Sequence, residues 1–126
     1  MFRSIFPIAI LVCLAALTLQ AADVSGQWSA QVPGRDGNMM DTAFNFKVAG
    51  EQLTGTMENQ YGEREISDGK VSGDNISFTI HIEFNGNEMT LIYTGKVSGN
   101  EIKFHRERKG GEAGPGTVDF VAKRKG

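Results

Sequence analysis

Residues 69–102 read GKVSGDNISFTIHIEFNGNEMTLIYTGKVSGNEI, and their pattern indicates the fold class. The string Gly-Lys-Val-Ser-Gly occurs twice in it, at 69–73 and at 95–99. Between Asn75 and Phe84 every second residue is apolar, and a period of two over this length is typical of a half-buried β-strand. The stretch therefore predicts long strands that are separated by glycine-led turns.

The turns predict the register of these strands. Four times the chain reads apolar, X, Gly, X, X, apolar, and a glycine at the first position of a two-residue hairpin loop suits a type II′ turn. Such a turn sets the two nearest apolar residues opposite each other on one face of the sheet. The predicted pairs are Val48–Leu53, Val71–Ile76, Phe84–Met89 and Val97–Ile102.

The whole chain after residue 22 carries the same alternation and shows no helical period, so we predict eight strands. An even number of antiparallel strands lets the first pair with the last, and closure removes exposed edges. We therefore predict an all-β fold, an eight-stranded antiparallel up-and-down (meander) barrel. The expected strands are residues 24–32, 42–49, 52–58, 64–72, 75–85, 88–98, 101–108 and 117–124.

One irregularity is expected in the fourth strand. Ile66 and Val71 should both face the interior, although they are separated by an odd number of residues. A β-bulge near Asp68-Gly69 would reconcile them. The alternative is that Ile66 faces outward.

The strand order also sorts the connections between the two ends of the barrel. The tight turns at residues 50, 73 and 99 should fall at one end. The opposite end should carry the links 33–41, 59–63 and 109–116, together with the short turn at 86. Long loops at one rim are where such folds usually carry function.

The N-terminal residues 1–22 have the order of a secretory signal peptide. Arg3 precedes an apolar run from Ile5 to Leu19, and the small residues Ala21 and Ala22 follow it. The run is short for a membrane span of roughly 20 residues, which argues against the alternative, an uncleaved membrane anchor. Cleavage after Ala21 or Ala22 would leave one domain, residues 23–126, with no membrane span, secreted or periplasmic, which we expect to be a monomer.

The composition of residues 23–126 narrows the class of protein. The only cysteine of the chain is Cys13, so disulfides cannot stabilise this domain and its apolar core must. Without Arg3 the domain carries 12 Lys and Arg against 15 Asp and Glu, a net charge of −3. This balance argues against a nucleic-acid partner, for which a basic stripe is expected.

Gly26-Gln27-Trp28 on the first strand resembles the Gly-X-Trp signature of the calycin superfamily, which includes the lipocalin and avidin barrels. Leu53-Thr54-Gly55-Thr56 looks like a strand sequence of the avidins. These strings, with Gly-Lys-Val-Ser-Gly and a final Phe-X-Ala-Lys-Arg, are also similar to a set of small exported bacterial domains that are uncharacterised. The resemblance implies a lipocalin-like barrel and export, not a function.

In calycins a basic residue of the last strand lies over the tryptophan at the closed end. Arg124 has the matching parity here, so the resemblance implies a structural cation–π contact of about 1 kcal/mol with Trp28. Biotin binding is not implied. Avidins have Asn and Tyr where this chain has Ala30 and Met57, and they line their site with several tryptophans, whereas this chain has one.

The inward positions of the seventh strand suggest a candidate ligand site. Arg106 and Arg108 share the parity of Phe104, and the register sets Arg106 opposite Tyr93. An arginine in an apolar interior needs a partner, so it either snorkels to the rim and pairs there, or binds a carboxylate or phosphate of a ligand. Tyr61 and Met40, with Met39, should be apolar contacts on the neighbouring loops.

No arrangement of residues points to catalysis, a metal or a cofactor. His81 and His105 should both face outward, on strands separated by a third and roughly 10 Å apart, which is too far to share a metal. The predicted register sets Glu83 opposite Thr90 and Glu88 opposite Asn85, so no acidic pair is expected. No nucleophile elbow, phosphate loop or zinc-protease string occurs.

These observations favour a non-catalytic, exported binding barrel. Its partner would be a small amphipathic or anionic ligand, or a protein, at the long-loop rim. The first alternative is a protein-interaction or inhibitor barrel without an internal ligand site, and a hydrolase is a weaker one. Large inward side chains are numerous, and eight strands enclose just enough room for side chains to fill, so the interior could be filled or hollow.

Overall fold

The computed structural model describes residues 23–34, 37–84, 86–110 and 116–125, and for Phe84 its backbone only. The predicted signal peptide, residues 1–22, lies outside this part. All regular structure in the described residues is β-strand, and none of their segments is a helix long and apolar enough to cross a membrane. The strands are β1 Gly26–Pro33, β2 Met39–Ala49, β3 Gln52–Asn59, β4 Gly62–Glu65, β5 Ser67–Ser72, β6 Asn75–Phe84, β7 Asn87–Ser98, β8 Glu101–Gly110 and β9 Gly116–Arg124.

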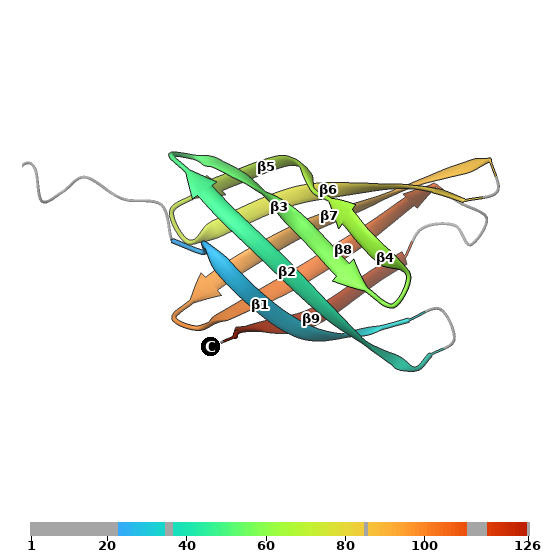
Figure 1. Ribbon diagram of the computed structural model, residues 1–126, viewed down its shortest axis with the longest axis horizontal. Coiled ribbons are helices and arrows are strands. Elements are labelled where there is room, and N and C mark those ends of the chain that lie inside the picture. Colours follow the sequence, from blue (N-terminus) through green and yellow to red (C-terminus); the bar gives the residue numbers. More distant parts are fainter. Residues whose placement is uncertain (1–22, 35–36, 85, 111–115, 126) are drawn as a thin grey trace, which may run out of the picture.

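The strands form one closed antiparallel barrel (Figure 1). Each strand except β4 pairs with the next, and β9 returns to pair with β1 through Trp28–Arg124 and Ala30–Ala122. Strands β4 and β5 are the two halves of a single wall strand, since β4 pairs with β3 and β5 pairs mainly with β6. The predicted eight-stranded up-and-down barrel is therefore confirmed, with its fourth strand in two pieces.

The predicted bulge lies within β5, just after the break at Ile66. The β5–β6 register shifts between Ser67 and Lys70, and Asp68 has a φ of 52°, a left-handed value that aspartate tolerates better than most residues. Ile66 and Val71 are both buried, so the expected inward position of both residues is confirmed, one on each side of the bulge. Only glycine fits at position 69, because a Cβ there would lie 2.0 Å from the carbonyl oxygen of Leu53.

Three of the four predicted turn registers are confirmed. Val48 pairs with Leu53, Val71 with Ile76 and Val97 with Ile102. The glycines that lead these turns have φ values of 66°, 59° and 61° at residues 50, 73 and 99, as a type II′ turn requires.

The fourth predicted register is wrong by two residues. Phe84 pairs with Asn87, and Met89 pairs with Ile82 instead of Phe84. Residues 85 and 86, whose sequence is Asn-Gly, therefore separate this pair, and Asn-Gly is the dipeptide that two-residue hairpins favour most. One consequence is that Glu83 lies directly opposite Glu88, rather than each facing a neutral residue.

The connections at the second end are shorter than predicted because the strands continue further. Pro33 pairs with Met39, so β2 begins three residues before the expected start, and β8 continues to Gly110. The link predicted at 59–63 is a two-residue turn, Gln60-Tyr61. We call this end, with the β1–β2, β3–β4, β6–β7 and β8–β9 connections, the open rim, and the other the closed end.

The interior of the barrel is filled by aromatic rings. Phe44, which is fully buried, lies within 6.3 Å of five other rings, measured between centroids. Phe78 and Tyr93 stack at 4.7 Å, and Phe104 and Phe120 stack at 5.2 Å. Rings at these separations touch, so the middle of the barrel is a packed core. The buried apolar residues are Val24, Trp28, Ala30, Val32, Phe44, Phe46, Leu53, Met57, Ile66, Val71, Ile76, Phe78, Ile80, Leu91, Tyr93, Ile102, Phe104, Phe120 and Ala122.

Candidate ligand-binding rim

Two arginines lie on the inner wall between the aromatic core and the open rim. Arg106 pairs with Tyr93 and Arg108 with Leu91, and both of these β7 residues are buried. Each arginine is itself half-buried. The inward positions of β8 are thus buried apolar residues at Ile102 and Phe104 and half-buried arginines at Arg106 and Arg108, which place two positive charges at the rim.

Arg106 is held against the hydroxyl of Tyr93 and has a spare donor. Its Nε is buried and has no hydrogen-bond partner among the described residues, and its guanidinium lies close enough to the Tyr93 hydroxyl to lower the pKa of that group. The Tyr93 hydroxyl in turn donates to the sulfur of Met57 at 3.3 Å. A buried donor without a partner costs free energy, and an anion that accepts from it would remove this cost.

The pKa of Tyr93 is raised above its usual value. Burial of the ring, which is 2% exposed, is the main cause, because it disfavours the phenolate. The positive charge of Arg106 and its hydrogen bond favour the phenolate, and they offset only part of this effect.

This shift predicts alkaline destabilisation. Above about pH 10 an unfolded chain loses the Tyr93 proton whereas the folded chain keeps it, so the free energy of unfolding should fall by about 1.4 kcal/mol per pH unit. Denaturant titrations between neutral pH and the alkaline range, followed by Trp28 fluorescence, measure this slope. Tyr93→Phe should reduce the slope, whereas Tyr61→Phe, at an exposed ring, should leave it unchanged. Equal slopes in both variants would contradict the assignment.

A third arginine, which was not predicted from the sequence, also faces the interior. Arg64 on β4 pairs with buried Met57, so it faces the interior, and it is half-buried. Its parity with Ile66, two residues later, could have identified it, since Ile66 was expected to face inward. Three positive side chains thus occupy inner-wall positions at the open rim.

The predicted apolar contacts of the rim have different surroundings. Met40 lies within β2 rather than on a loop, faces Val32 and is half-buried. Tyr61 lies at the β3–β4 turn with its ring 61% exposed, and its backbone N–H donates to Oδ1 of Asn59 at 2.8 Å. Met39 is also exposed, so the rim offers apolar side chains beside the arginines.

The closed end is sealed by Trp28 and Arg124. The guanidinium carbon of Arg124 lies 4.4 Å from the centre of the Trp28 ring, and Trp28 donates its indole N–H to the carbonyl of Val24 at 2.9 Å. Arg124 also donates to the backbone carbonyls of Ser25 and Asp23, each at 3.0 Å. These bonds tie the last strand to the start of the first, which leaves the arginine no freedom to hold a ligand.

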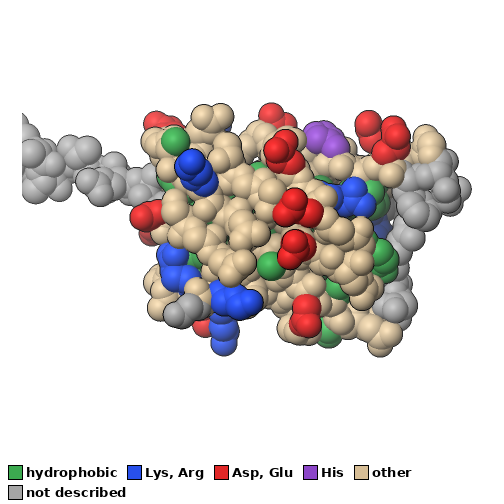
Figure 2. Space-filling view, viewed as in Figure 1, with side chains coloured by type: hydrophobic (Ala, Val, Ile, Leu, Met, Phe, Trp, Pro, Cys, Tyr) green, Lys and Arg blue, Asp and Glu red, His purple; other side chains and the backbone are tan. Residues whose placement is uncertain are grey.

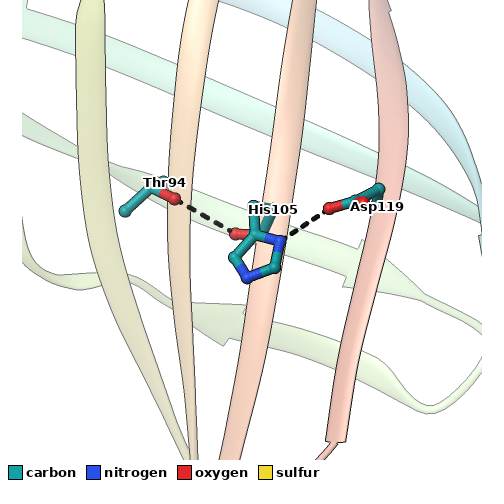
Figure 3. A network of polar contacts seen from close by, with 3 residues as sticks. All are labelled: Thr94, His105 and Asp119. Atoms are coloured by element: carbon teal, nitrogen blue, oxygen red, sulfur yellow. Dashed lines mark hydrogen bonds and ion pairs between the residues drawn. The ribbon is translucent and has the colours of Figure 1, made fainter.

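The histidines lie on the outer wall. His105 Nδ1 is 2.6 Å from Oδ1 of Asp119, and Thr94 donates to the His105 carbonyl at 3.5 Å (Figure 3). The His105 and Asp119 side chains are 50% and 81% exposed, so this pair contributes little to stability. Among the described residues, no group of three or more His, Cys, Asp or Glu could hold a metal ion.

The distance estimated for the two histidines from strand spacing alone is too short. His81 lies opposite Thr90 and His105 opposite Thr94. They are therefore offset by four residues along β7, about 13 Å, in addition to two strand spacings.

Two hollows lie on the outer wall of the described part of the barrel. One, of about 410 Å³, lies over β5–β8 among Lys70, Lys96, Lys103 and His105. Another, of about 780 Å³, lies over β1, β2, β3 and β9 between Glu58 and Lys123. Neither reaches Tyr93 or Arg106, which agrees with a filled interior.

Comparison of the chain with protein-family models, with curated proteins and with solved structures returned no match. The class that the fold defines is a small antiparallel β-barrel with a filled core. Its function has to be inferred from its own residues.

Proposed function

We propose that this protein is a non-catalytic, exported binding barrel of the calycin type, which takes an anionic group at its open rim. The group would be a carboxylate or a phosphate, held by Arg106 with Arg108 and Arg64 beside it. The rest of the ligand would remain at the mouth, next to Met40 and Tyr61, because the core below is packed. A medium-chain fatty acid or a phosphorylated surface molecule has this chemistry.

One observation carries the proposal, which is the buried Nε of Arg106 without a hydrogen-bond partner among the described residues. A structural arginine normally satisfies its donors within the protein, as Arg124 does at the closed end. A planar guanidinium with a free donor, on an inner wall and near solvent, suits the geometry of a carboxylate or phosphate.

The calycin assignment and export belong to the same proposal. They are supported by the closed antiparallel barrel, by Arg124 over Trp28, and by the order of charge, apolar run and small residues in 1–22. Expression of the full chain, followed by N-terminal sequencing of the exported product, tests this part. A mature N-terminus at Ala22 or Asp23 is expected, and a retained leader would contradict it.

The binding proposal is tested by thermal shift and calorimetry. The probes are inorganic phosphate, decanoate and, as a neutral comparator, glucose. At about 100 times its Kd a ligand should stabilise the fold by about 2.7 kcal/mol, and we expect this from an anionic probe only. Arg106→Met should abolish the shift, whereas the control Lys47→Met, at an exposed residue near the closed end, should keep it. The rim site is wrong if no anion shifts the melt, or if Arg106→Met binds normally.

A second candidate is a protein-interaction or inhibitor barrel without an internal ligand site. The packed aromatic core favours it, since a filled barrel offers a small molecule only a shallow mouth. The exposed ring of Tyr61 and the arginines of the rim would then contact a protein. A stoichiometric protein captured from the native secretome, with no response to the anionic probes, would favour this candidate.

A further inference from the structure

The barrel wall is incomplete on one side of β6 near the open rim. Strand β6 pairs with β7 along its full length, from Asn75 to Phe84. On its other side it pairs with β5 only as far as Thr79. Strand β4, which would have to cover the remainder, pairs with β3 alone among the described strands. Residues 80–84 of β6 therefore form a free strand edge, and β4 diverges from it (Figure 1).

The alternation of β6 identifies the backbone groups at this edge. Ser72 and Asn75 close a two-residue turn, so both backbone groups of Asn75 point toward β5. Every second residue after Asn75 points the same way, and this set includes His81 and Glu83. Beyond Thr79 no described strand lies there to accept their N–H groups or to donate to their carbonyls. An edge of this kind is a template for an added strand.

The side chains on both sides of the edge are acidic on the outside and apolar on the inside. Glu83 on β6 lies opposite Glu88, and Glu63 on β4 lies opposite Glu58. Glu65 is the next outward residue of β4. Like charges directly opposite each other destabilise a sheet by about 0.2–1 kcal/mol, so two such pairs oppose folding unless positive charge is added.

The inner side of the edge is apolar. Ile80 is fully buried and Ile82 is half-buried on the inward face of β6. On the face that Figure 2 shows, acidic side chains lie at the left as well as over the middle and the right, whereas basic ones gather mainly at the left, toward the closed end. The edge thus offers main-chain bonds, an apolar inner face and a negative outer surface.

We propose that this edge binds an extended, basic segment of a partner protein, which adds to β6 as an antiparallel strand between β6 and β4. Main-chain bonds to His81 and Glu83 would hold it. Its outward residues would be Lys or Arg, next to Glu63, Glu65 and Glu83, and its inward residues would be apolar, next to Ile82. Arg64 lies on β4 beside this edge, but it faces the interior, whereas the carboxylates of the edge face outward. The edge and the rim arginines attract opposite charges, so the edge does not depend on the proposed ligand.

The proposal is tested with an alternating lysine–valine peptide of about six residues, the length of one strand. Binding is measured by calorimetry, and amide exchange is followed by NMR. We expect the amides of His81 and Glu83 to become protected when the peptide binds. A peptide of the same sequence with alternate N-methyl groups keeps the charge and cannot pair along one edge, so its Kd should be at least about tenfold weaker.

Matched variants separate the edge from general electrostatics. The double variant Glu63→Lys and Glu83→Lys should weaken binding at least about tenfold, and Glu51→Lys with Glu101→Lys, which changes the charge equally at the closed end, should have little effect. Equal binding of the N-methylated peptide, unprotected amides at His81 and Glu83, or equal effects of the two double variants would overturn the proposal. So would concentration-dependent self-association through β6 that the peptide does not reverse.

Discussion

Phe44→Ala is expected to lower the free energy of unfolding by about 3–5 kcal/mol. Phe44 is fully buried, and its ring lies within 6.3 Å of the rings of Phe46, Phe78, Tyr93, Phe104 and Phe120. The substitution removes the centre of this cluster and leaves a cavity that five large rings on different strands cannot easily collapse into. A domain of this size has about 5–15 kcal/mol of stability in total, so the loss would be a large part of it.

Urea unfolding, followed by the fluorescence of the single tryptophan, measures this effect. The control is Val121→Ala on the outer wall of β9, where the side chain is 40% exposed and the loss should stay within about 0.5 kcal/mol. Phe44→Leu should fall between the two. A loss below about 1.5 kcal/mol for Phe44→Ala would mean that the barrel centre is not the packed core described here.

The fold could be predicted because its information is local and repeated. A period of two assigns each strand a buried face, and glycine at the head of a two-residue turn sets the register on either side. Val71–Ile76 and Val97–Ile102 follow from this rule and are confirmed. The rule failed next to Gly86, where the sequence allowed two overlapping turns, and the observed pairing of Phe84 with Asn87 is the one that places Asn-Gly between the strands.

The candidate rim could be predicted only in part. Parity alone identified Arg106 opposite Tyr93, and it would have identified Arg64 if the rule had been applied before the bulge as well as after it. The free donor of Arg106 depends on where side chains from several strands meet, and no local pattern encodes that.

The filled interior and the free edge of β6 are also non-local. Whether eight strands enclose a cavity depends on the summed volume of the inward side chains and on how their rings stack, as Phe78 does on Tyr93. The edge arises because the two halves of the fourth wall strand have different partners, since β4 pairs with β3, whereas β5, which contains the bulge, pairs with β6. The bulge could be predicted from parity, but the partner of each half of the strand could not, since a bulge bends its strand by an amount that the sequence does not specify.

Gly55→Ala is expected to be as damaging as the loss of the Phe44 ring, at about 3–5 kcal/mol, although it adds a single methyl group. Gly55 lies within β3 opposite Phe46, with a φ of 149°. A Cβ there would lie 1.9 Å from the carbonyl oxygen of Asn45 and 2.9 Å from its carbonyl carbon. These atoms belong to the backbone of β2, so the strand itself would have to move, and the β2–β3 pairing would be lost locally.

Gly50→Ala is the matched control for this prediction, because it separates backbone strain from the steric clash. Gly50 also has a positive φ, 66°, but a Cβ there would meet nothing within 4 Å. Its substitution should therefore cost only the left-handed conformation, about 1–2 kcal/mol. Both variants are compared with the parent by urea unfolding and by the NMR shifts of the β2 amides, which only Gly55→Ala should change widely. If Gly55→Ala were no more destabilising than Gly50→Ala, the close approach of β2 and β3 at Asn45 would be wrong.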